Sequence, residues 1–392
     1  MKRRLILFAA ILIAGATLRV VWNDIDADDF SPDDEQRYVD YSTHLAQEGW
    51  ASFPRLVHAH IVDQKEWIYP GPLRWGHLAL TSLACRLSTE CGPRALANLS
   101  TVAGILSILF TFLIGRLLLG DEAALVAAAL TISSPLQLGM GRRALQDEVL
   151  CASALLTLWL LSWLVIKPPT ATTRRALLIA GALASATLTA GIKESFLMYY
   201  PAIAAMLFLL APQPRKRTFL PAFLVLAAAP ILSAVIFCIL SHSVDAYFAL
   251  WRINTGQIDA PFARAYQSGP FDRPLFDLLL LSPIVTVLAI AGAGRAGKNA
   301  GVNALAGFTL VALTVFGLFS SKNARYVIVV DPIDRLLAAS LIVALPRRPW
   351  VPLAVIALVA ATELSLFYTL FEIGDVFDPL TYNLLKVLRV MP

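Results

Sequence analysis

Three consecutive acidic residues, Asp33, Asp34 and Glu35, open the stretch SPDDEQRYVDYSTHLAQEGW, which spans residues 31–50. This stretch follows an apolar segment, residues 4–22, that has the length and composition of a membrane span. A carboxylate at the surface of a bilayer can act as a general base, because it can take the proton of a hydroxyl group within hydrogen-bond reach. The acidic cluster is therefore the first candidate for chemistry in this sequence.

The same acids also suit the first turn of a helix. Ser31 is a favourable N-cap and Pro32 suits the first helical position. Asp34 lies three residues after Ser31, as in a capping box, and acids in a first turn favour the helix dipole. An apolar stripe then continues to Leu45, and Gly49 can end the helix. Capping and catalysis are both open for this cluster on local pattern alone.

Further charged residues lie at the ends of other apolar segments. They are Arg142, Arg143, Asp147 and Glu148 in GRRALQDEVL, Lys193 and Glu194 in GIKES, and Lys322 and Arg325 in SSKNARY. Ionisable groups at membrane depth are costly and are functional candidates by default. The alternative for each basic residue is a snorkelling interfacial anchor, and we weigh it most for Arg74, Arg143 and Lys322. Together these segments suit a site that binds an anionic lipid headgroup beside a catalytic carboxylate.

The composition requires that these residues be positioned by membrane-spanning helices. Of the 392 residues, 58% are hydrophobic and 15% charged, and the mean hydropathy is +0.69. Soluble chains carry about 25% charged residues. The net charge of +5 resides largely in short loops, where it signals topology rather than nucleic-acid binding. The sequence contains no zinc-ligand spacing, P-loop or dinucleotide-binding glycine motif. We predict an all-α polytopic membrane protein with a single domain over residues 1–392.

A helix needs about 20 apolar residues to cross the hydrocarbon core. On this criterion we predict eleven spans, at 4–22, 95–118, 122–140, 148–166, 176–192, 196–211, 218–240, 274–293, 302–320, 326–345 and 350–371. The apolar segment 75–88 is short and contains Arg86, which favours an interfacial helix. The first segment could instead be a cleaved signal peptide, but its apolar run continues to Trp22, so we expect it to be retained.

Basic residues in the short loops give the orientation. They place the N-terminus and the 167–175 loop in the cytoplasm, and the loops 23–94 and 241–273 and the C-terminal segment outside. Some outer loops also carry basic residues, which therefore need another explanation. The long loop 23–94 holds the acidic motif, so we expect any chemistry at the outer surface of the membrane.

The order of these motifs resembles the type C glycosyltransferase superfamily, and most closely its protein O-mannosyltransferase and aminoarabinose (lipid A) transferase branch. The resemblance begins with a first span followed by an acid pair that opens a helix as D-E-x-R-Y, here Asp34, Glu35, Arg37 and Tyr38. It continues with Tyr69, Pro70, Pro72, Arg74 and Trp75 in WIYPGPLRWGHL, with Asp147 before the fourth span, and with Arg325, Tyr326 and Pro332. The family has Lys-Gly after the fifth span, where this chain has Lys193-Glu194. The resemblance covers residues 1–345.

The resemblance implies an inverting transfer of a sugar from a polyprenyl-phosphate-linked donor to an acceptor, with Asp34 as general base. Glu35 and Asp147 are the further candidate catalytic acids, Asp147 either supporting the site or binding the acceptor. The candidates for binding the donor phosphate are Arg37, Arg74, Lys193, Lys322, Arg325 and Tyr326. No cofactor is implied; the clustered acids could bind a divalent metal, but no ligand spacing demands one. We expect a lipid or glycan acceptor and a bacterial inner membrane, with the site facing the periplasm.

Two other functions compete with this interpretation. A lipid-linked sugar flippase or secondary transporter should have charges near the membrane midplane and a detectable repeat, whereas the charges here gather on one face. A non-catalytic assembly subunit is the other alternative.

Four further features have both a structural and a functional interpretation. Cys85 and Cys91 either form a disulfide in an oxidising compartment or are free thiols. Asp331 and Arg335, four residues apart, favour a structural ion pair over a catalytic one. The aromatic residues of loop 241–273 suit an interfacial belt better than sugar contact. The C-terminal segment can form an amphipathic interfacial helix.

Overall fold

The computed structural model describes residues 2–23, 34–212, 216–257, 261–297, 299–345, 348, 350–376 and 379–390. Throughout these ranges the regular secondary structure is helical, which confirms the predicted all-α polytopic class. The acids and caps at 31–33, including Asp33, lie outside the described residues.

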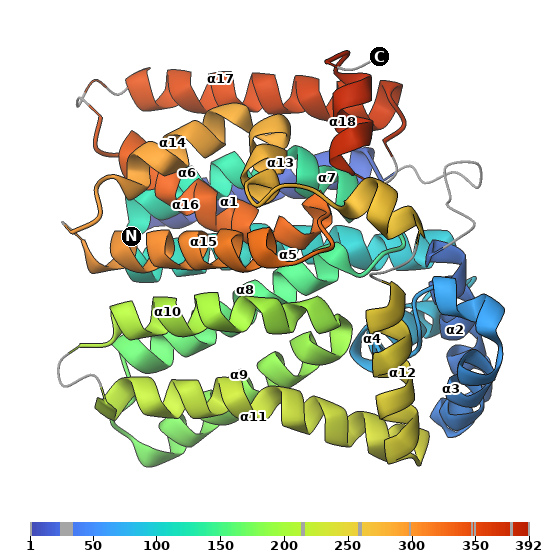
Figure 1. The fold of residues 1–392 in the computed structure, drawn as a ribbon. Helices are drawn as coiled ribbons and strands as arrows, with labels where there is room; N and C mark the ends of the chain where they lie inside the picture. The colour runs from blue at the N-terminus through green and yellow to red at the C-terminus, as the bar shows by residue number, and fades with distance from the viewer. Residues whose placement is uncertain are drawn as a thin grey trace.

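Long apolar helices run side by side and form the body of the molecule (Figure 1). They are α1 (Lys2–Val21), α5 (Pro93–Leu118), α8 (Asp147–Ile166), α9 (Thr172–Ile192), α11 (Lys216–Ser241), α15 (Ala300–Leu318) and α17 (Trp350–Phe367). Shorter helices complete the bundle: α6 (Asp121–Ile132), α7 (Pro135–Gly141), α10 (Tyr200–Leu210), α14 (Pro283–Ala293) and α16 (Val330–Ile342).

The predicted count of eleven spans is not confirmed. Among the described residues, seven helices are long and apolar enough to cross a membrane, or eight if α6 and α7, which are bent by 58°, form one span. The predicted span 196–211 holds the shorter apolar helix α10, and the predicted span 274–293 is divided between α13 (Arg273–Leu281) and the shorter apolar helix α14. Pro135 and Pro283 occupy the first turns of α7 and α14, each directly after a serine, and so begin new helices within predicted continuous spans.

Helices α2 (Asp34–Glu48), α3 (Phe53–Val62), α4 (Trp75–Leu87) and α12 (Val244–Gly256) gather at one end of the bundle, on the right of Figure 1. The other described helices are α13 (Arg273–Leu281) and α18 (Thr381–Val387). Short 3₁₀ or π turns join the helices: η2 (Trp50–Ser52), η3 (Gln64–Ile68), η4 (Glu194–Tyr199), η6 (Ala263–Gln267), η7 (Ala324–Val327) and η8 (Tyr368–Ile373).

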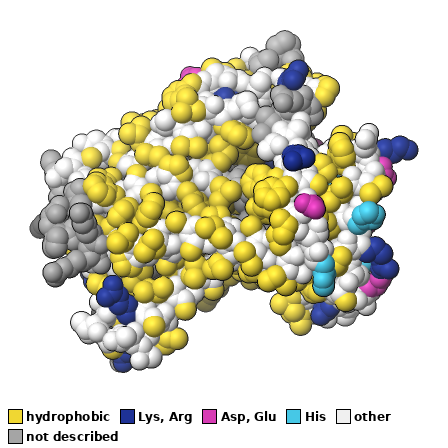
Figure 2. All heavy atoms as spheres, turned by 60° about the horizontal axis from the view of Figure 1, so that its bottom comes forward, with side chains coloured by type: hydrophobic (Ala, Val, Ile, Leu, Met, Phe, Trp, Pro, Cys, Tyr) yellow, Lys and Arg dark blue, Asp and Glu magenta, His cyan; other side chains and the backbone are white. Residues whose placement is uncertain are grey.

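The N-terminus lies at the opposite end of the bundle (Figure 1), where Arg4 pairs with Asp121 of α6 at 2.8 Å. The space-filling view agrees with a membrane-embedded body. Hydrophobic side chains cover much of the middle of the face shown, and most of the visible charged and histidine side chains lie towards its ends (Figure 2).

The long loop after the first span folds into a small unit with its own hydrophobic core. Tyr38 and Leu45 of α2, Phe53 of α3, Leu78 of α4 and Phe237 of α11 are all fully buried in this core. The first loop therefore packs against α11 and covers this end of the bundle. Its helices can hold side chains in defined positions.

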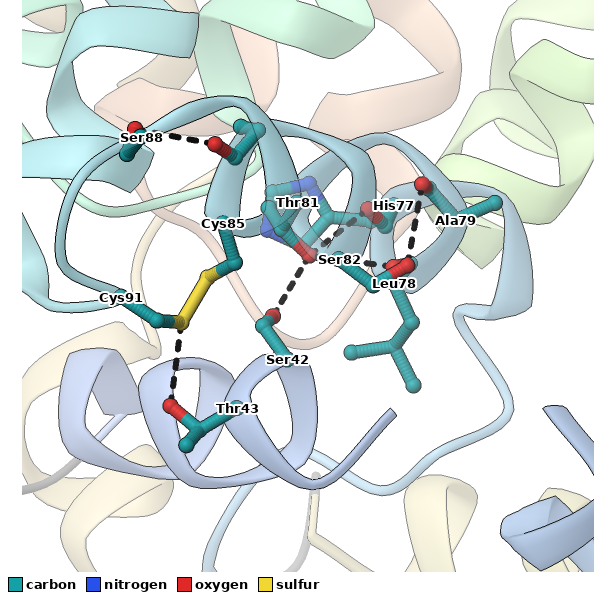
Figure 3. The surroundings of a disulfide bond; sticks show 11 residues. Ser42, Thr43, His77, Leu78, Ala79, Thr81, Ser82, Cys85, Ser88 and Cys91 are labelled. Atoms are coloured by element: carbon teal, nitrogen blue, oxygen red, sulfur yellow. Dashed lines mark hydrogen bonds between the residues drawn. A yellow bond between two sulfur atoms is a disulfide. The ribbon is translucent and has the colours of Figure 1, made fainter. Parts of the chain in front are cut away.

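The disulfide between Cys85 and Cys91 ties α4 to the segment before α5 (Figure 3), which decides between the two predicted states of these cysteines. Thr43 of α2 donates a hydrogen bond to the Cys91 sulfur at 3.0 Å, and Ser42 donates one to Thr81 at 2.7 Å. The bridge and these two hydrogen bonds fix α4 against α2.

We expect alkylation of the denatured, unreduced protein to modify Cys151 and Cys238 only, because these are the free cysteines. After reduction, mass spectrometry should find all four cysteines modified. Replacing Cys85 and Cys91 together by Ser should lower the free energy of unfolding by about 2 kcal/mol, because a short closed loop would be released. Alkylation of Cys85 and Cys91 without reduction would contradict the bridge.

Candidate active site

Helix α2 begins at Asp34, a half-buried residue, and places Tyr38 one turn later on nearly the same face. The Tyr38 side chain is fully buried, and its hydroxyl accepts a hydrogen bond from the Arg74 guanidinium. The charge of Asp34 interacts with the Tyr38 phenol. Asp34 thus lies at the start of α2, next to a buried Tyr–Arg pair.

Glu35 fixes the orientation of this helix. Its side chain is fully buried, and its carboxylate accepts hydrogen bonds from Arg143 Nε at 3.0 Å and Arg143 Nη2 at 2.8 Å. The backbone N–H of Ala144 donates a further bond to Glu35 Oε1 at 2.7 Å. These contacts anchor α2 on the turn before α8, so the Glu35 side chain is engaged in holding the helix in place.

Arg74 is held in place by Glu194, the residue that departs from the Lys-Gly pattern. Arg74 Nε lies 2.9 Å from Glu194 Oε2, and Nη2 lies 2.5 Å from Oε1. The two segments meet because Gly76 and Gly191 allow α4 to approach α9; a methyl group on Gly76 would lie 2.8 Å from the Gly191 backbone. Glu194 thus neutralises Arg74, so Arg74 orients Tyr38 and is a weaker candidate for binding phosphate.

Lys193 and Arg325 converge on Asp147 from two different segments. Lys193 Nζ lies 2.6 Å from Asp147 Oδ1, and Arg325 Nη1 lies 3.7 Å from Asp147 Oδ2. Asp147 is fully buried at the first turn of α8, and Lys193 is 4% exposed. The Lys193 ammonium also lies 5.3 Å from the centre of the Tyr326 ring. Four predicted site residues thus form one cluster, with Asp147 holding the two cations in place.

His77 is a further residue of this region that the sequence analysis missed. It is 1% exposed, its ring meets that of Tyr38 edge-on with centroids 4.7 Å apart, and neither ring nitrogen has a hydrogen-bond partner among the described residues. Burial and the nearby charges of Arg74 and Lys193 lower the pKa of His77 to about 3, although Asp147 opposes them. The ring is therefore neutral and packs edge-on against Tyr38. A single histidine in an apolar segment has no second ligand or catalytic residue at a recognisable spacing, so the sequence pattern did not indicate His77.

Besides Arg74, two further predicted phosphate-binding residues lie outside this cluster. Arg37 pairs with Glu66 at 2.9 Å and lies over the Tyr69 ring, 4.7 Å from its centroid. Lys322 donates from Nζ to the Phe319 carbonyl oxygen at 2.8 Å. Both side chains are long enough to reach other partners. Arg37 reaches Glu66 on η3, and Lys322 reaches a backbone oxygen three residues earlier in the chain.

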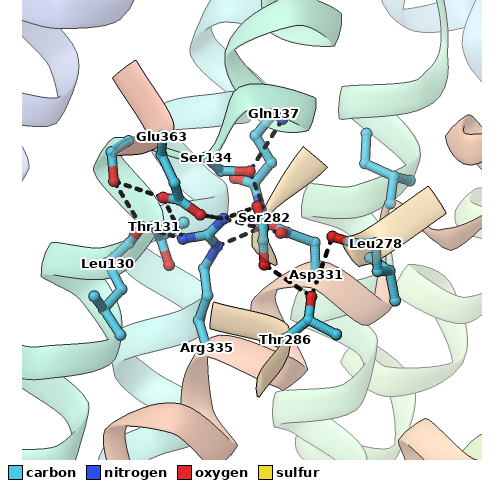
Figure 4. A network of polar contacts seen from close by, with 12 residues as sticks. Leu130, Thr131, Ser134, Gln137, Leu278, Ser282, Thr286, Asp331, Arg335 and Glu363 are labelled. Atoms are coloured by element: carbon cyan, nitrogen blue, oxygen red, sulfur yellow. Dashed lines mark hydrogen bonds and ion pairs between the residues drawn. The ribbon is translucent and has the colours of Figure 1, made fainter. Parts of the chain in front are cut away.

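A second network of buried polar contacts lies among the helices (Figure 4). Arg335 is fully buried and binds Asp331 at 3.0 Å, so the predicted structural pair is present. Glu363 of α17 binds the same guanidinium at 2.8 Å and was not predicted. Asp331 also accepts hydrogen bonds from Ser134 at 2.9 Å and Gln137 at 3.1 Å. The network therefore joins α16 and α17 to the bend between α6 and α7.

No group of three or more His, Cys, Asp or Glu side chains arranged to hold a metal ion occurs within the residues that the structure describes.

The helical fold of this chain is similar to that of several solved structures. ArnT from Cupriavidus metallidurans bound to undecaprenyl phosphate matches with a TM-score of 0.65 and 17% identity, over 91% of this chain and 63% of that one. The Archaeoglobus fulgidus oligosaccharyltransferase in its apo form matches with a TM-score of 0.59 and 13% identity, over 93% and 55%. AglB from the same organism, in complex with an inhibitory peptide and a dolichol-phosphate, matches with a TM-score of 0.54 and 12% identity, over 92% and 55%.

Residues 76–241 match the family model of dolichyl-phosphate-mannose-protein mannosyltransferases. The resemblance that the sequence motifs predicted is thereby confirmed at the level of the superfamily. No protein of curated function matches the sequence. The chain spans less than two thirds of the length of the solved structures it matches.

Proposed function

We propose that this protein is a glycosyltransferase that moves a sugar from a polyprenyl-phosphate-linked donor to an acceptor hydroxyl at the outer face of a membrane. The observation that carries the proposal is the placement of Asp34 at the start of α2, at the same end of the bundle as the Asp147–Lys193–Arg325 cluster. The matched ArnT structure contains undecaprenyl phosphate, and the matched AglB structure contains a dolichol-phosphate and a peptide. A lipid phosphate is therefore the donor class that these likenesses support.

In the proposed reaction, the acceptor oxygen attacks the anomeric carbon of the donor sugar as Asp34 takes the hydroxyl proton. The bond between the anomeric carbon and the phosphate oxygen breaks, and its electron pair leaves with the polyprenyl phosphate. The new bond forms on the opposite face of the sugar, so the configuration at this carbon is inverted. The proton then passes from Asp34 to water, which regenerates the base.

The phosphate leaving group needs cations that are already in place when its charge develops. Lys193 and Arg325 supply them, and Asp147 fixes their positions from the first turn of α8. Arg can bind phosphate through two parallel hydrogen bonds, and Lys acts as a point charge. In this proposal Tyr326, whose ring lies beside the Lys193 ammonium, donates a hydrogen bond to the same phosphate. Arg74 and Tyr38 do not contact the donor phosphate in this proposal. Their hydrogen bond orders the part of α2 that carries Asp34.

For the orientation we propose a cytoplasmic N-terminus and an active site on the outer side, in a bacterial inner membrane. The basic N-terminus and the acidic motif lie at opposite ends of the bundle (Figure 1), and basic residues favour the cytoplasmic side. The Cys85–Cys91 disulfide lies at the end with the acidic motif, which suits an oxidising compartment.

Replacing Arg325 by Ala should raise the KM for the donor about 10- to 150-fold, because a hydrogen bond to a charged group is typically worth about 1.5–3 kcal/mol. Sugar transfer by the purified protein in lipid nanodiscs, measured against donor concentration, gives this value. The matched control is Lys322→Ala, a buried cation outside the cluster, which should leave the donor KM within about twofold. An unchanged donor KM for Arg325→Ala, or an equal loss for Lys322→Ala, would contradict the phosphate assignment.

A further inference from the structure

A cavity of about 370 Å³ lies between α2, α3 and η3. It is lined by Arg37, Asp40, Tyr41, His44, Leu56, Ala59, His60, Asp63 and Glu66. Ligand pockets for small molecules begin at about 300 Å³, so the cavity has room for one or two sugar rings. Its wall combines hydrogen-bonding side chains with two apolar residues, Leu56 and Ala59.

Arg37 pairs with two of the three acids of the wall. It binds Glu66 at 2.9 Å and lies 3.7 Å from Asp40, which also accepts a hydrogen bond from Gln36 at 2.6 Å. The third acid, Asp63, accepts a hydrogen bond from the Lys65 backbone N–H at 3.0 Å. These contacts fix the directions of the side chains and leave the wall with more acids than arginines, which disfavours an anion such as a phosphate. Carboxylates accept hydrogen bonds from hydroxyl groups, so the wall suits a ligand that is rich in hydroxyl groups and carries no negative charge.

A buried pair, Tyr41 and His60, closes one side of the cavity. The Tyr41 hydroxyl lies 3.0 Å from His60 Nδ1, and His60 is 2% exposed. His60 Nε2 has no hydrogen-bond partner among the described residues. Burial lowers the pKa of His60 to about 4, so the ring is neutral. Nδ1 is bound to Tyr41 and Nε2 is enclosed by protein, so this pair fixes the shape of the wall, and the wall side chains left to contact sugar hydroxyls include Asp40, His44, Asp63 and Glu66.

The cavity lies next to the proposed base along α2. Arg37 and Tyr41 follow Asp34 by three and seven residues, which places all three on one side of the helix. Arg37 is about 4.5 Å further along the helix axis, at 1.5 Å per residue. A ligand in the cavity would therefore lie about one helical turn from Asp34.

We propose that this cavity binds a neutral sugar residue of a glycan acceptor, adjacent to the residue whose hydroxyl is deprotonated by Asp34. The inference rests on the proposed function and narrows the acceptor to a glycan. A sugar in this cavity could also come from the donor, so the experiment must separate the two sources.

The test measures binding of free neutral sugars to the full-length protein in detergent by saturation-transfer-difference NMR. The panel comprises the methyl glycosides of glucose, galactose, mannose and N-acetylglucosamine, together with maltose and cellobiose. Ala59→Trp fills the cavity from an exposed position of its wall. Ala51→Trp is the matched control, since Ala51 is an exposed alanine of η2 that does not line the cavity. His44→Ala, at the rim, is a second variant that removes a polar contact instead of adding bulk.

At least one sugar should bind the wild type, the Asp34→Asn variant and Ala51→Trp equally. Its affinity should fall tenfold or more in Ala59→Trp and several-fold in His44→Ala. Free polyprenyl phosphate should leave the signal unchanged, because the donor phosphate binds elsewhere. Absence of binding to the wild type, equal binding to Ala59→Trp, or displacement by polyprenyl phosphate would overturn the inference. Failure of the proposed function would instead appear as absent donor turnover in a wild type that still binds the sugar.

Discussion

Replacing Asp34 by Asn should leave α2 folded and abolish nearly all sugar transfer. Asn keeps the size of the side chain and an oxygen that can accept a hydrogen bond, but it cannot take a proton. Loss of a general base typically costs about 10²- to 10⁴-fold in rate. Transfer would be measured with wild-type and variant protein added to membranes from cells that lack the protein, and thermal unfolding would be measured on the same preparations.

The control for this variant is Glu48→Gln, the same type of change at the exposed, C-terminal end of α2, where Glu48 pairs with Arg55. An exposed ion pair contributes little, so both stability and transfer should stay near wild-type values. If the acids serve only as a helix cap, Asp34→Asn should retain most of the activity. Transfer by Asp34→Asn at more than about a tenth of the wild-type rate would contradict the base assignment.

Replacing Arg335 by Leu should destabilise the protein by about 3–5 kcal/mol, because Asp331 and Glu363 would be left buried without their shared cation. Both carboxylates are almost completely buried, so water cannot compensate for the lost partner. We expect a lower thermal unfolding temperature and less protein in the membrane.

The network also supplies the control. The triple variant Arg335→Leu, Asp331→Asn, Glu363→Gln removes the buried charges together and should recover a large part of the lost stability. Arg4→Leu, which breaks a pair with an exposed arginine, should change stability by less than about 0.5 kcal/mol. An Arg335→Leu protein that unfolds at the wild-type temperature would show that the network does not hold α16 and α17 in place.

Two features could be predicted from the sequence: the all-helical class, and the convergence of motifs that lie far apart in the chain. Long apolar segments have few alternatives to helices, and charges at their ends must find partners. Asp147, Lys193 and Arg325 met as the motif order predicted, although they come from three segments far apart in the chain.

The side-chain partners were harder to predict than the helices. Arg37 and Lys322 have types and loop positions that suit phosphate, but the length of their side chains lets them reach local partners instead. Glu35 was grouped with Asp34, and only the fold shows that adjacent residues on α2 face different neighbours. Glu363, an acid within an apolar span, carried a signal that could have been used, since such a residue needs a buried partner.

Serine–proline breaks interrupt two of the predicted continuous spans, 122–140 and 274–293. A hydropathy window averages over Ser134-Pro135 and Ser282-Pro283, although the second residue of each pair begins a new helix. The bend between α6 and α7 places Ser134 and Gln137 where they bind Asp331. This contact depends on tertiary packing that local pattern does not encode.

The most direct test of the central claim is mass spectrometry of the membrane lipids of cells that lack the protein, with and without complementation. A polyprenyl-phosphate-linked sugar should accumulate in the deletion strain, return to its normal level when the wild-type protein is restored, and stay elevated when Asp34→Asn is expressed to the same level. Equal amounts of every polyprenyl-phosphate sugar in all three strains would contradict the claim that this protein consumes such a donor.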